Sequence, residues 1–317
     1  MRIVISRREF LGTSLGAAAA LALTPELLSA LQQSGGQLIQ RAIPSSGEML
    51  PVIGLQFGNS NSLDPAALKE VLKTLVDNGG RFLDTMHQSV PGVEDLTGTV
   101  VTELGLQDKL FLGLRALPPG PPQPGAATPK AKVEALLAKF RVPKIDLLQL
   151  PVQADPAQWP ALQELKKEGR IRYISATVIV KQLYPQLEAL MRNEPIDFIG
   201  VDYSLDNRNA EEKILPLAQE RKIGVVAYFP FSTGTLFQRA GSIPLPDWAA
   251  DYNIKTWSQF FLKYVVSHPA VTVVRAGTTQ AKHMLENIGG GIGRVPDEAT
   301  RKRMAAVVDA LPGRAWK

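Results

Sequence analysis

The stretch Gly80-Arg81-Phe82-Leu83-Asp84-Thr85 joins a short apolar run to a single carboxylate. Arg81–Asp84 has the length and composition of a buried strand, and it follows a segment with helical periodicity at Pro65–Asn78. The same alternation of strand and helix extends along most of the chain. It predicts parallel strands that are joined by right-handed helical crossovers.

Further strand-like runs and helical segments follow in alternation. The other strand-like runs are Val52–Phe57, Leu110–Arg115, Ile145–Leu150, Ile171–Ser175, Phe198–Tyr203, Gly224–Tyr228 and Val271–Val274. The other helical segments are Pro129–Phe140, Ala157–Glu168, Val180–Met191, Asn209–Arg221, Thr256–Ser267 and Gln280–Ile288. Eight units in about 240 residues match one (β/α)8 barrel. A doubly wound open sheet is the alternative, but no Gly-x-Gly-x-x-Gly follows the first strand. We expect a final outer helix within Arg294–Leu311.

The first residues have the character of an export signal. Arg7-Arg8 is followed by Phe10-Leu11 and by an apolar run from Leu11 to Leu23. This run is shorter than the roughly 20 residues that a membrane-spanning helix needs. The arginine pair resembles a twin-arginine signal, and an ordinary amphipathic leader is the alternative. We expect residues 1–35 to be a signal and linker that engages the twin-arginine export machinery, and 36–317 to be one barrel without a permanent membrane span, periplasmic or extracellular.

Composition excludes several kinds of site. The chain of 317 residues has a net charge of +5 and a pI near 9.3, with basic and acidic residues interspersed, so we expect no nucleic-acid partner. It contains no cysteine, which excludes disulfides, thiolate metal sites and a cysteine nucleophile. Its 3 histidines show no metal-ligand spacing, so we expect no metal site.

Active groups of a (β/α)8 barrel lie at the carboxyl ends of its strands. Alternation along each strand selects Asp84, Arg115, Pro151 and Asp202 as the last inward-facing residues. Asp84 and Arg115 have opposite charges on neighbouring strands, so we expect an ion pair between them.

Five segments in order resemble the aldo/keto reductase family over residues 43–311. They are Ile43–Leu55, Gly80–Thr85, Glu168–Ile174, Val226–Leu236, and Ala276–Gln280 with Leu285-Glu286-Asn287. The resemblance implies a (β/α)8 barrel that opens with an N-terminal hairpin. It also implies binding of NADPH or NADH and reduction of a small-molecule carbonyl by direct hydride transfer.

The resemblance also implies four catalytic positions, of which this chain keeps one. The family's aspartate is Asp84, whereas Arg115 stands at the lysine, Pro151 at the histidine and Ser89 at or near the tyrosine. Serine is far too weak an acid to replace a tuned phenol, arginine does not release its proton, and proline offers no donor. We therefore predict that Asp84 and Arg115 polarise the site, and that His87 or water supplies the proton.

The cofactor positions implied by the resemblance are better kept. Tyr228 matches the tyrosine on which the nicotinamide stacks, and the segment from Gly277 would place backbone N–H groups at a helix N-terminus. The full predicted set is Tyr228, Ser232, Gly234, Leu236, Gly277, Thr278, Thr279, Gln280, His283, Glu286 and Asn287. His283 replaces the arginine that grips the 2′-phosphate, and Gly200 and Thr177-Val178 replace the carboxamide ligands. The cofactor is therefore expected to be NADP or NAD.

Two functions stay open from the sequence. The first is a divergent oxidoreductase that acts on a carbonyl or alcohol. The second is a non-catalytic exported barrel that binds a nucleotide, a small ligand or a protein partner. Sugar hydrolysis would need Asp84 and Asp202 as its carboxylate pair, and a triad of Ser89, His87 and Asp84 is disfavoured by their closeness in sequence.

Overall fold

The computed structural model describes residues 36–57, 64–85, 92–115 and 127–313. The chain divides into a unit of residues 1–35, which lies outside the described residues, and a unit of residues 36–317. The predicted export signal, His87 and Ser89 all lie outside the described residues.

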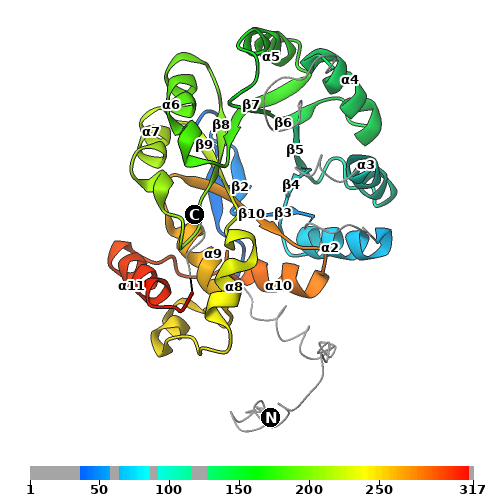
Figure 1. Ribbon diagram of the computed structural model, residues 1–317. Helices are drawn as coiled ribbons and strands as arrows, with labels where there is room; N and C mark the ends of the chain where they lie inside the picture. The colour runs from blue at the N-terminus through cyan, green and yellow to red at the C-terminus, as the bar shows by residue number, and fades with distance from the viewer. Residues whose placement is uncertain (1–35, 58–63, 86–91, 116–126, 314–317) are drawn as a thin grey trace. The chain divides into compact units, whose positions relative to one another are not determined.

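Eight parallel strands close into a barrel in the order β10-β3-β4-β5-β6-β7-β8-β9 (Figure 1). They are β3 (Ile53–Gln56), β4 (Phe82–Asp84), β5 (Phe111–Arg115), β6 (Ile145–Pro151), β7 (Ile171–Val178), β8 (Phe198–Asp202), β9 (Gly224–Tyr228) and β10 (Val271–Gly277). Pairing of β10 with β3 closes the sheet, for example at Val274 and Ile53. The predicted (β/α)8 barrel is therefore confirmed, and the open doubly wound sheet is excluded.

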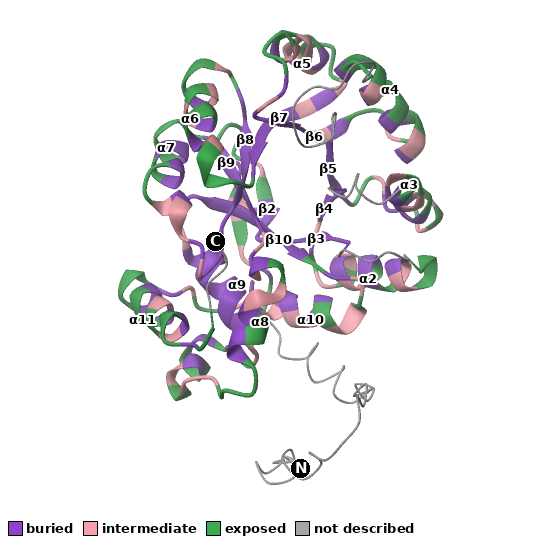
Figure 2. Ribbon diagram, in the orientation of Figure 1, coloured by how far each residue is buried: buried purple, intermediate pink, exposed green. Residues whose placement is uncertain are grey.

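Helices surround the barrel; most bury one face, and the helix at Trp257–Ser267 is buried almost throughout, as Figure 2 shows. They are α2 (Pro65–Asp77), α3 (Val93–Glu103), α4 (Pro129–Phe140), α5 (Gln158–Lys167), α6 (Tyr184–Asn193), α7 (Ile214–Glu220), α8 (Thr235–Ala240), α9 (Trp257–Ser267), α10 (Ala281–Gly289) and α11 (Glu298–Asp309). Side chains cap several N-termini: Asp64, Thr128 and Thr256 each accept a backbone N–H of the first turn. None of the described helices is long and apolar enough to cross a membrane.

Helix α3 is absent from the sequence prediction. Its sequence VEDLTGTVVTE contains a glycine and several β-branched residues, which weaken helix propensity. Tertiary packing favours it instead, because Gly98 lies against α4, where an added Cβ would be 2.9 Å from Cγ of Lys139. The outer helix expected within Arg294–Leu311 is present as α11, which begins after the capping side chain of Asp297.

The expected hairpin precedes the barrel and fills the amino end of its interior. Strands β1 (Gln40–Ala42) and β2 (Met49–Pro51) pair antiparallel. Ile43 and Leu50 of this hairpin join a buried cluster with inward-facing side chains of the barrel strands, among them Phe82, Phe111 and Phe198. The rings of Phe82 and Phe111 stack with centroids 5.8 Å apart. An apolar layer therefore fills this end of the barrel, and polar side chains begin above it.

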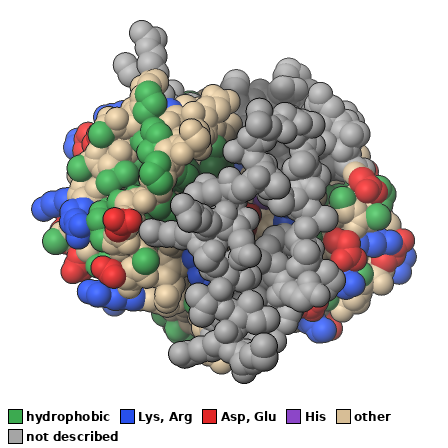
Figure 3. Space-filling model, turned by 90° about the horizontal axis from the view of Figure 1, so that it is seen from below, with side chains coloured by type: hydrophobic (Ala, Val, Ile, Leu, Met, Phe, Trp, Pro, Cys, Tyr) green, Lys and Arg blue, Asp and Glu red, His purple; other side chains and the backbone are tan. Residues whose placement is uncertain are grey.

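Charged side chains on the face shown in Figure 3 are interspersed. Over the described part of that face, basic and acidic side chains alternate and neither sign gathers into one patch.

Candidate active site

A layer of buried polar side chains lies at the carboxyl end of the barrel, above the apolar layer. Asp84, Tyr228 and Arg275 each follow by two positions a residue of the apolar interior cluster, namely Phe82, Val226 and Val273. Since alternate residues of a strand face the same side, all three side chains point into the barrel. The layer also includes Gln149 of β6, and all four side chains are buried.

Asp84 forms its ion pair with Arg275 at the end of β10. Nη1 of Arg275 donates to Oδ2 of Asp84 at 3.2 Å, and both side chains are fully buried. The sequence prediction that Arg115 would be this partner is wrong: Arg115 donates to Oγ1 of Thr177 at 3.1 Å and to the hydroxyl of Tyr228 at 3.3 Å. Arg275 was missed because β10 was expected to end at Val274, whereas it continues to Gly277.

Tyr228 crosses the barrel interior beneath Arg275. The guanidinium carbon of Arg275 lies 3.8 Å from the centroid of the tyrosine ring, and the ring is 0% exposed. The phenol hydroxyl also hydrogen-bonds Oε1 of Gln149. A Cβ added at Gly200 would lie 2.4 Å from both Cζ and the hydroxyl oxygen of Tyr228, so this position of the ring requires glycine on β8. Tyr228 can therefore occupy this position only because residue 200 has no side chain.

Burial also determines what Tyr228 can do chemically. Desolvation raises the pKa of its phenol well above the ordinary value, and the nearby carboxylate of Asp84 raises it further. An efficient general acid has a pKa near the working pH. Tyr228 is therefore poorly suited to donate a proton near neutral pH.

The two other mouth candidates lie at strand ends with different surroundings. Pro151 is the last residue of β6 and is buried. Asp202, the last residue of β8, accepts hydrogen bonds from the hydroxyl of Tyr184 at 2.9 Å and from Nδ2 of Asn207 at 2.6 Å. Burial raises the pKa of Asp202. Asp202 therefore pairs with Tyr184 of α6 and with Asn207 after β8, and no contact among the described residues joins it to Asp84.

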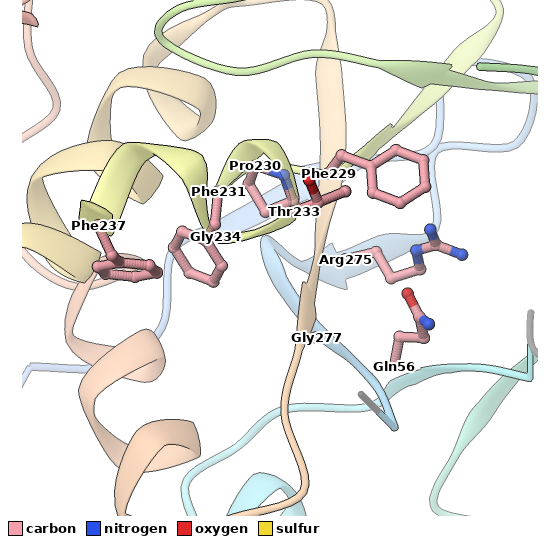
Figure 4. A pocket seen from close by; sticks show the side chains of 9 residues that line it. All are labelled: Gln56, Phe229, Pro230, Phe231, Thr233, Gly234, Phe237, Arg275 and Gly277. Carbon is pink, nitrogen blue, oxygen red and sulfur yellow. The ribbon is translucent and has the colours of Figure 1, made fainter. Parts of the chain in front are cut away.

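A pocket of about 290 Å³ opens beside the polar layer. It is lined by Gln56, Phe229, Pro230, Phe231, Thr233, Gly234, Phe237, Arg275 and Gly277. Figure 4 shows Arg275 and Gln56 at one end of the pocket and Phe237 at the other. The pocket thus extends from the end of β10 to helix α8.

The loop that forms one wall of this pocket has an unusual backbone. Phe229, Ser232 and Thr233 have φ values of 52°, 48° and 53°, in the left-handed region that non-glycine residues seldom adopt. Such strain persists where surrounding contacts hold it. Here the buried hydroxyl of Ser232 hydrogen-bonds Ser204 and the carboxylate of Asp206. These hydrogen bonds therefore hold the backbone of this pocket wall in its left-handed conformation.

The predicted cofactor residues fall into three groups around this pocket. Gly234 and Gly277 line it. Thr278 and Gln280 form the turn before α10, where Oγ1 of Thr278 accepts the N–H of Gln280 at 3.0 Å. Thr279 lies between them, and α10 carries exposed His283, half-buried Glu286 and buried Asn287. Ser232 and Leu236 are buried outside the pocket lining, and Tyr228 lies inside the barrel. Their roles in binding stay predictions.

This arrangement suits one part of a dinucleotide better than the other. Glycine backbone at the pocket wall and the N-terminus of α10 suit ribose and phosphate groups. The guanidinium of Arg275 lies over the ring of Tyr228, which the sequence predicts to carry the nicotinamide. Among the described residues, no cluster of His, Asp or Glu side chains could hold a metal ion.

Comparison with known proteins finds a family model and solved structures that resemble this chain. The sequence model described as the aldo/keto reductase family matches residues 52–301. An aldo-keto reductase from Klebsiella pneumoniae in complex with NADPH is 20% identical, with a TM-score of 0.68 over 89% of this chain and 98% of that one. An aldo-keto reductase from Bacillus halodurans in its holo form is 21% identical, with a TM-score of 0.69 over 89% of this chain and 100% of that one.

Proposed function

Because this chain belongs to the aldo/keto reductase family, we propose that it binds NADP or NAD and acts as a divergent oxidoreductase on a carbonyl or alcohol substrate. The observation that carries this proposal is the pocket between the loop at Phe231–Gly234 and the end of β10, which reaches Arg275 of the buried polar layer. The similar Klebsiella pneumoniae structure contains NADPH, which supports a dinucleotide as the ligand.

Several described residues suit such a ligand. Gly234 and Gly277 would let the phosphates approach the backbone, and the N-terminus of α10 favours negative charge. His283 and Lys282 would lie toward the adenosine and would set the preference between NADP and NAD. When bound, the nicotinamide donates or accepts the hydride.

The chain's own contribution to the chemistry centres on Asp84. Its buried carboxylate holds Arg275, and Arg115 adds a second guanidinium that contacts Thr177 and Tyr228. Positive charge in a water-poor site stabilises a developing alkoxide. Neither arginine can release its proton, and the pKa of the Tyr228 phenol is raised. His87 or a water molecule is therefore the proposed proton donor.

The same buried polar side chains also favour a second function. The contact of Arg275 with Tyr228 covers the ring, and Pro151 provides no donor at the mouth. A non-catalytic protein that binds a nucleotide, another small ligand or a partner would not need a nicotinamide ring to reach Tyr228. We keep it as the alternative proposal.

The proposal also includes export of the protein from the cytoplasm. Arg7-Arg8 and the apolar run that follows support export by the twin-arginine machinery, which carries folded proteins. The proposed site of action is the periplasm or the extracellular space.

Titration of the full chain with NADPH and NADH tests the proposal, with binding followed by calorimetry and turnover by nucleotide absorbance over a panel of aldehydes and ketones. Binding of at least one nucleotide and turnover that falls in His87→Ala would support the oxidoreductase. Binding without turnover, unchanged in His87→Ala, would select the alternative. Failure of both nucleotides to bind would contradict the dinucleotide proposal.

A further inference from the structure

Arg275 stands between the pocket and the ring of Tyr228. It lines the pocket at the end next to Gln56, and its guanidinium carbon lies 3.8 Å from the centroid of Tyr228. We propose that Arg275 is a specificity-determining residue that keeps the nicotinamide ring off Tyr228, so that this barrel recognises the adenosine diphosphate ribose part of a dinucleotide. This inference rests on the dinucleotide binding proposed above, and within that proposal it favours the alternative of binding without hydride transfer.

The distances leave no space for a third planar group. Aromatic and guanidinium planes in contact are about 3.5 Å apart, so a ring inserted between Arg275 and Tyr228 would need roughly 7 Å. The observed separation of 3.8 Å is that of direct contact. Movement of the tyrosine toward β8 is also limited, because a Cβ built on Gly200 would lie only 2.4 Å from its hydroxyl oxygen. A nicotinamide ring therefore reaches the face of Tyr228 that Arg275 covers only if Arg275 leaves.

Arg275 is also held from its other side. Its Nη1 donates to Oδ2 of Asp84 at 3.2 Å, and both side chains are 0% exposed. Moving the arginine would separate a buried ion pair and leave the carboxylate of Asp84 without this partner, which is strongly unfavourable. The arginine thus occupies the ring face through two contacts that a nicotinamide would have to replace.

The size of the pocket agrees with a partial ligand. Its volume of about 290 Å³ is at the lower limit of typical ligand pockets. Arg275 and Gln56 close its inner end, and the rings of Phe231 and Phe237, 5.0 Å apart, lie at the outer end (Figure 4). The lining therefore favours ribose and phosphate groups near the glycines and stops before the barrel interior.

Calorimetry with the full chain can separate the two halves of the ligand, using NADH and ADP-ribose as the probes. For the unmodified protein we expect the two dissociation constants to agree within about threefold, because the nicotinamide adds no contact. In an Asp84→Asn/Arg275→Leu variant, which removes both charges together, we expect NADH to bind about tenfold more tightly and ADP-ribose to change less than about twofold. Arg303→Leu is the matched control, because Arg303 stacks on Trp248 at 4.4 Å, outside the pocket lining, and should change neither affinity.

The outcomes distinguish this inference from the proposed function. NADH binding at least about tenfold more tightly than ADP-ribose to the unmodified protein would overturn the inference alone, and this comparison needs no variant. The inference would equally be overturned if the double variant changed both affinities alike or changed neither. If neither probe nor NADPH bound to any of these proteins, dinucleotide binding itself would be refuted, and the inference with it.

Discussion

Replacing Gly200 with alanine tests the position of Tyr228 directly. The added Cβ would lie 2.4 Å from Cζ and from the hydroxyl oxygen of Tyr228, and 2.7 Å from Cε2. Carbon atoms in contact are about 3.5–4.0 Å apart, so the ring would have to move by roughly 1 Å. Arg275 on its face and Gln149 at its hydroxyl oppose that movement. We expect the free energy of unfolding to fall by about 3 kcal/mol, at the upper end of the usual cost of overpacking.

Thermal and urea denaturation of the full chain measure this loss, which corresponds to a decrease in Tm of about 6–10 °C. Gly277→Ala is the control, because a Cβ there meets nothing within 4 Å and its φ is not positive. The decisive comparison repeats Gly200→Ala in a Tyr228→Leu background, where the clash is absent and the added cost should be below about 0.5 kcal/mol. An equal cost in both backgrounds, or almost none in either, would refute the placement of Tyr228 across β8.

Three further predictions follow from particular contacts and from the N-terminal sequence. Asp84→Asn should lower the free energy of unfolding by about 3 kcal/mol, because it leaves Arg275 buried without its carboxylate. The double variant Asp84→Asn/Arg275→Leu should lose less stability than the sum of the two single variants. Additive losses in denaturation experiments would contradict this coupling. Burial, and then the charge of Arg301, lowers the pKa of His268 to about 4. The unfolded chain therefore binds a proton near pH 6.5 that the folded chain does not. The contribution of neutral His268 to the free energy of unfolding should be fully present above pH 6.5, and the free energy should fall by about 1–2 kcal/mol between pH 7 and pH 5. If the same pH dependence persists in His268→Asn, His268 is not its source. Arg7→Lys together with Arg8→Lys should stop export of the chain in a cell-fractionation assay, whereas an ordinary leader would tolerate the change.

The barrel could be predicted because its signals are local. Short apolar runs that alternate with amphipathic segments fix the order of elements, and the eight-unit count favours closure. Helix α3 was missed because its glycine and β-branched residues oppose helix formation, and contacts with α4 outweigh that preference. Val93, Val100 and Val101 do recur at helical spacing and are buried, so this pattern is the signal that could have found the helix.

The candidate site was predictable as a region but not as a set of contacts. Asp84 was identified correctly as a buried residue at a strand end, and two of the predicted cofactor glycines do line the pocket. The partner of Asp84 could not be chosen from the sequence, because Arg115 and Arg275 both follow their strands' alternation toward the interior. Extending the strand from Val273 to Gly277 would have revealed Arg275, since it lies on the same side of the strand as Val273. The choice between the two arginines depends on how β10 pairs with β3, which only the closed barrel determines.

The most direct test of Arg275 as the residue that closes the barrel interior is a crystal structure of the full chain grown with NADP. We expect the adenosine and phosphate groups beside Gly277 and α10, with Arg275 still stacked on Tyr228 and paired with Asp84. A nicotinamide ring stacked on Tyr228, with Arg275 displaced from it, would contradict this role of Arg275.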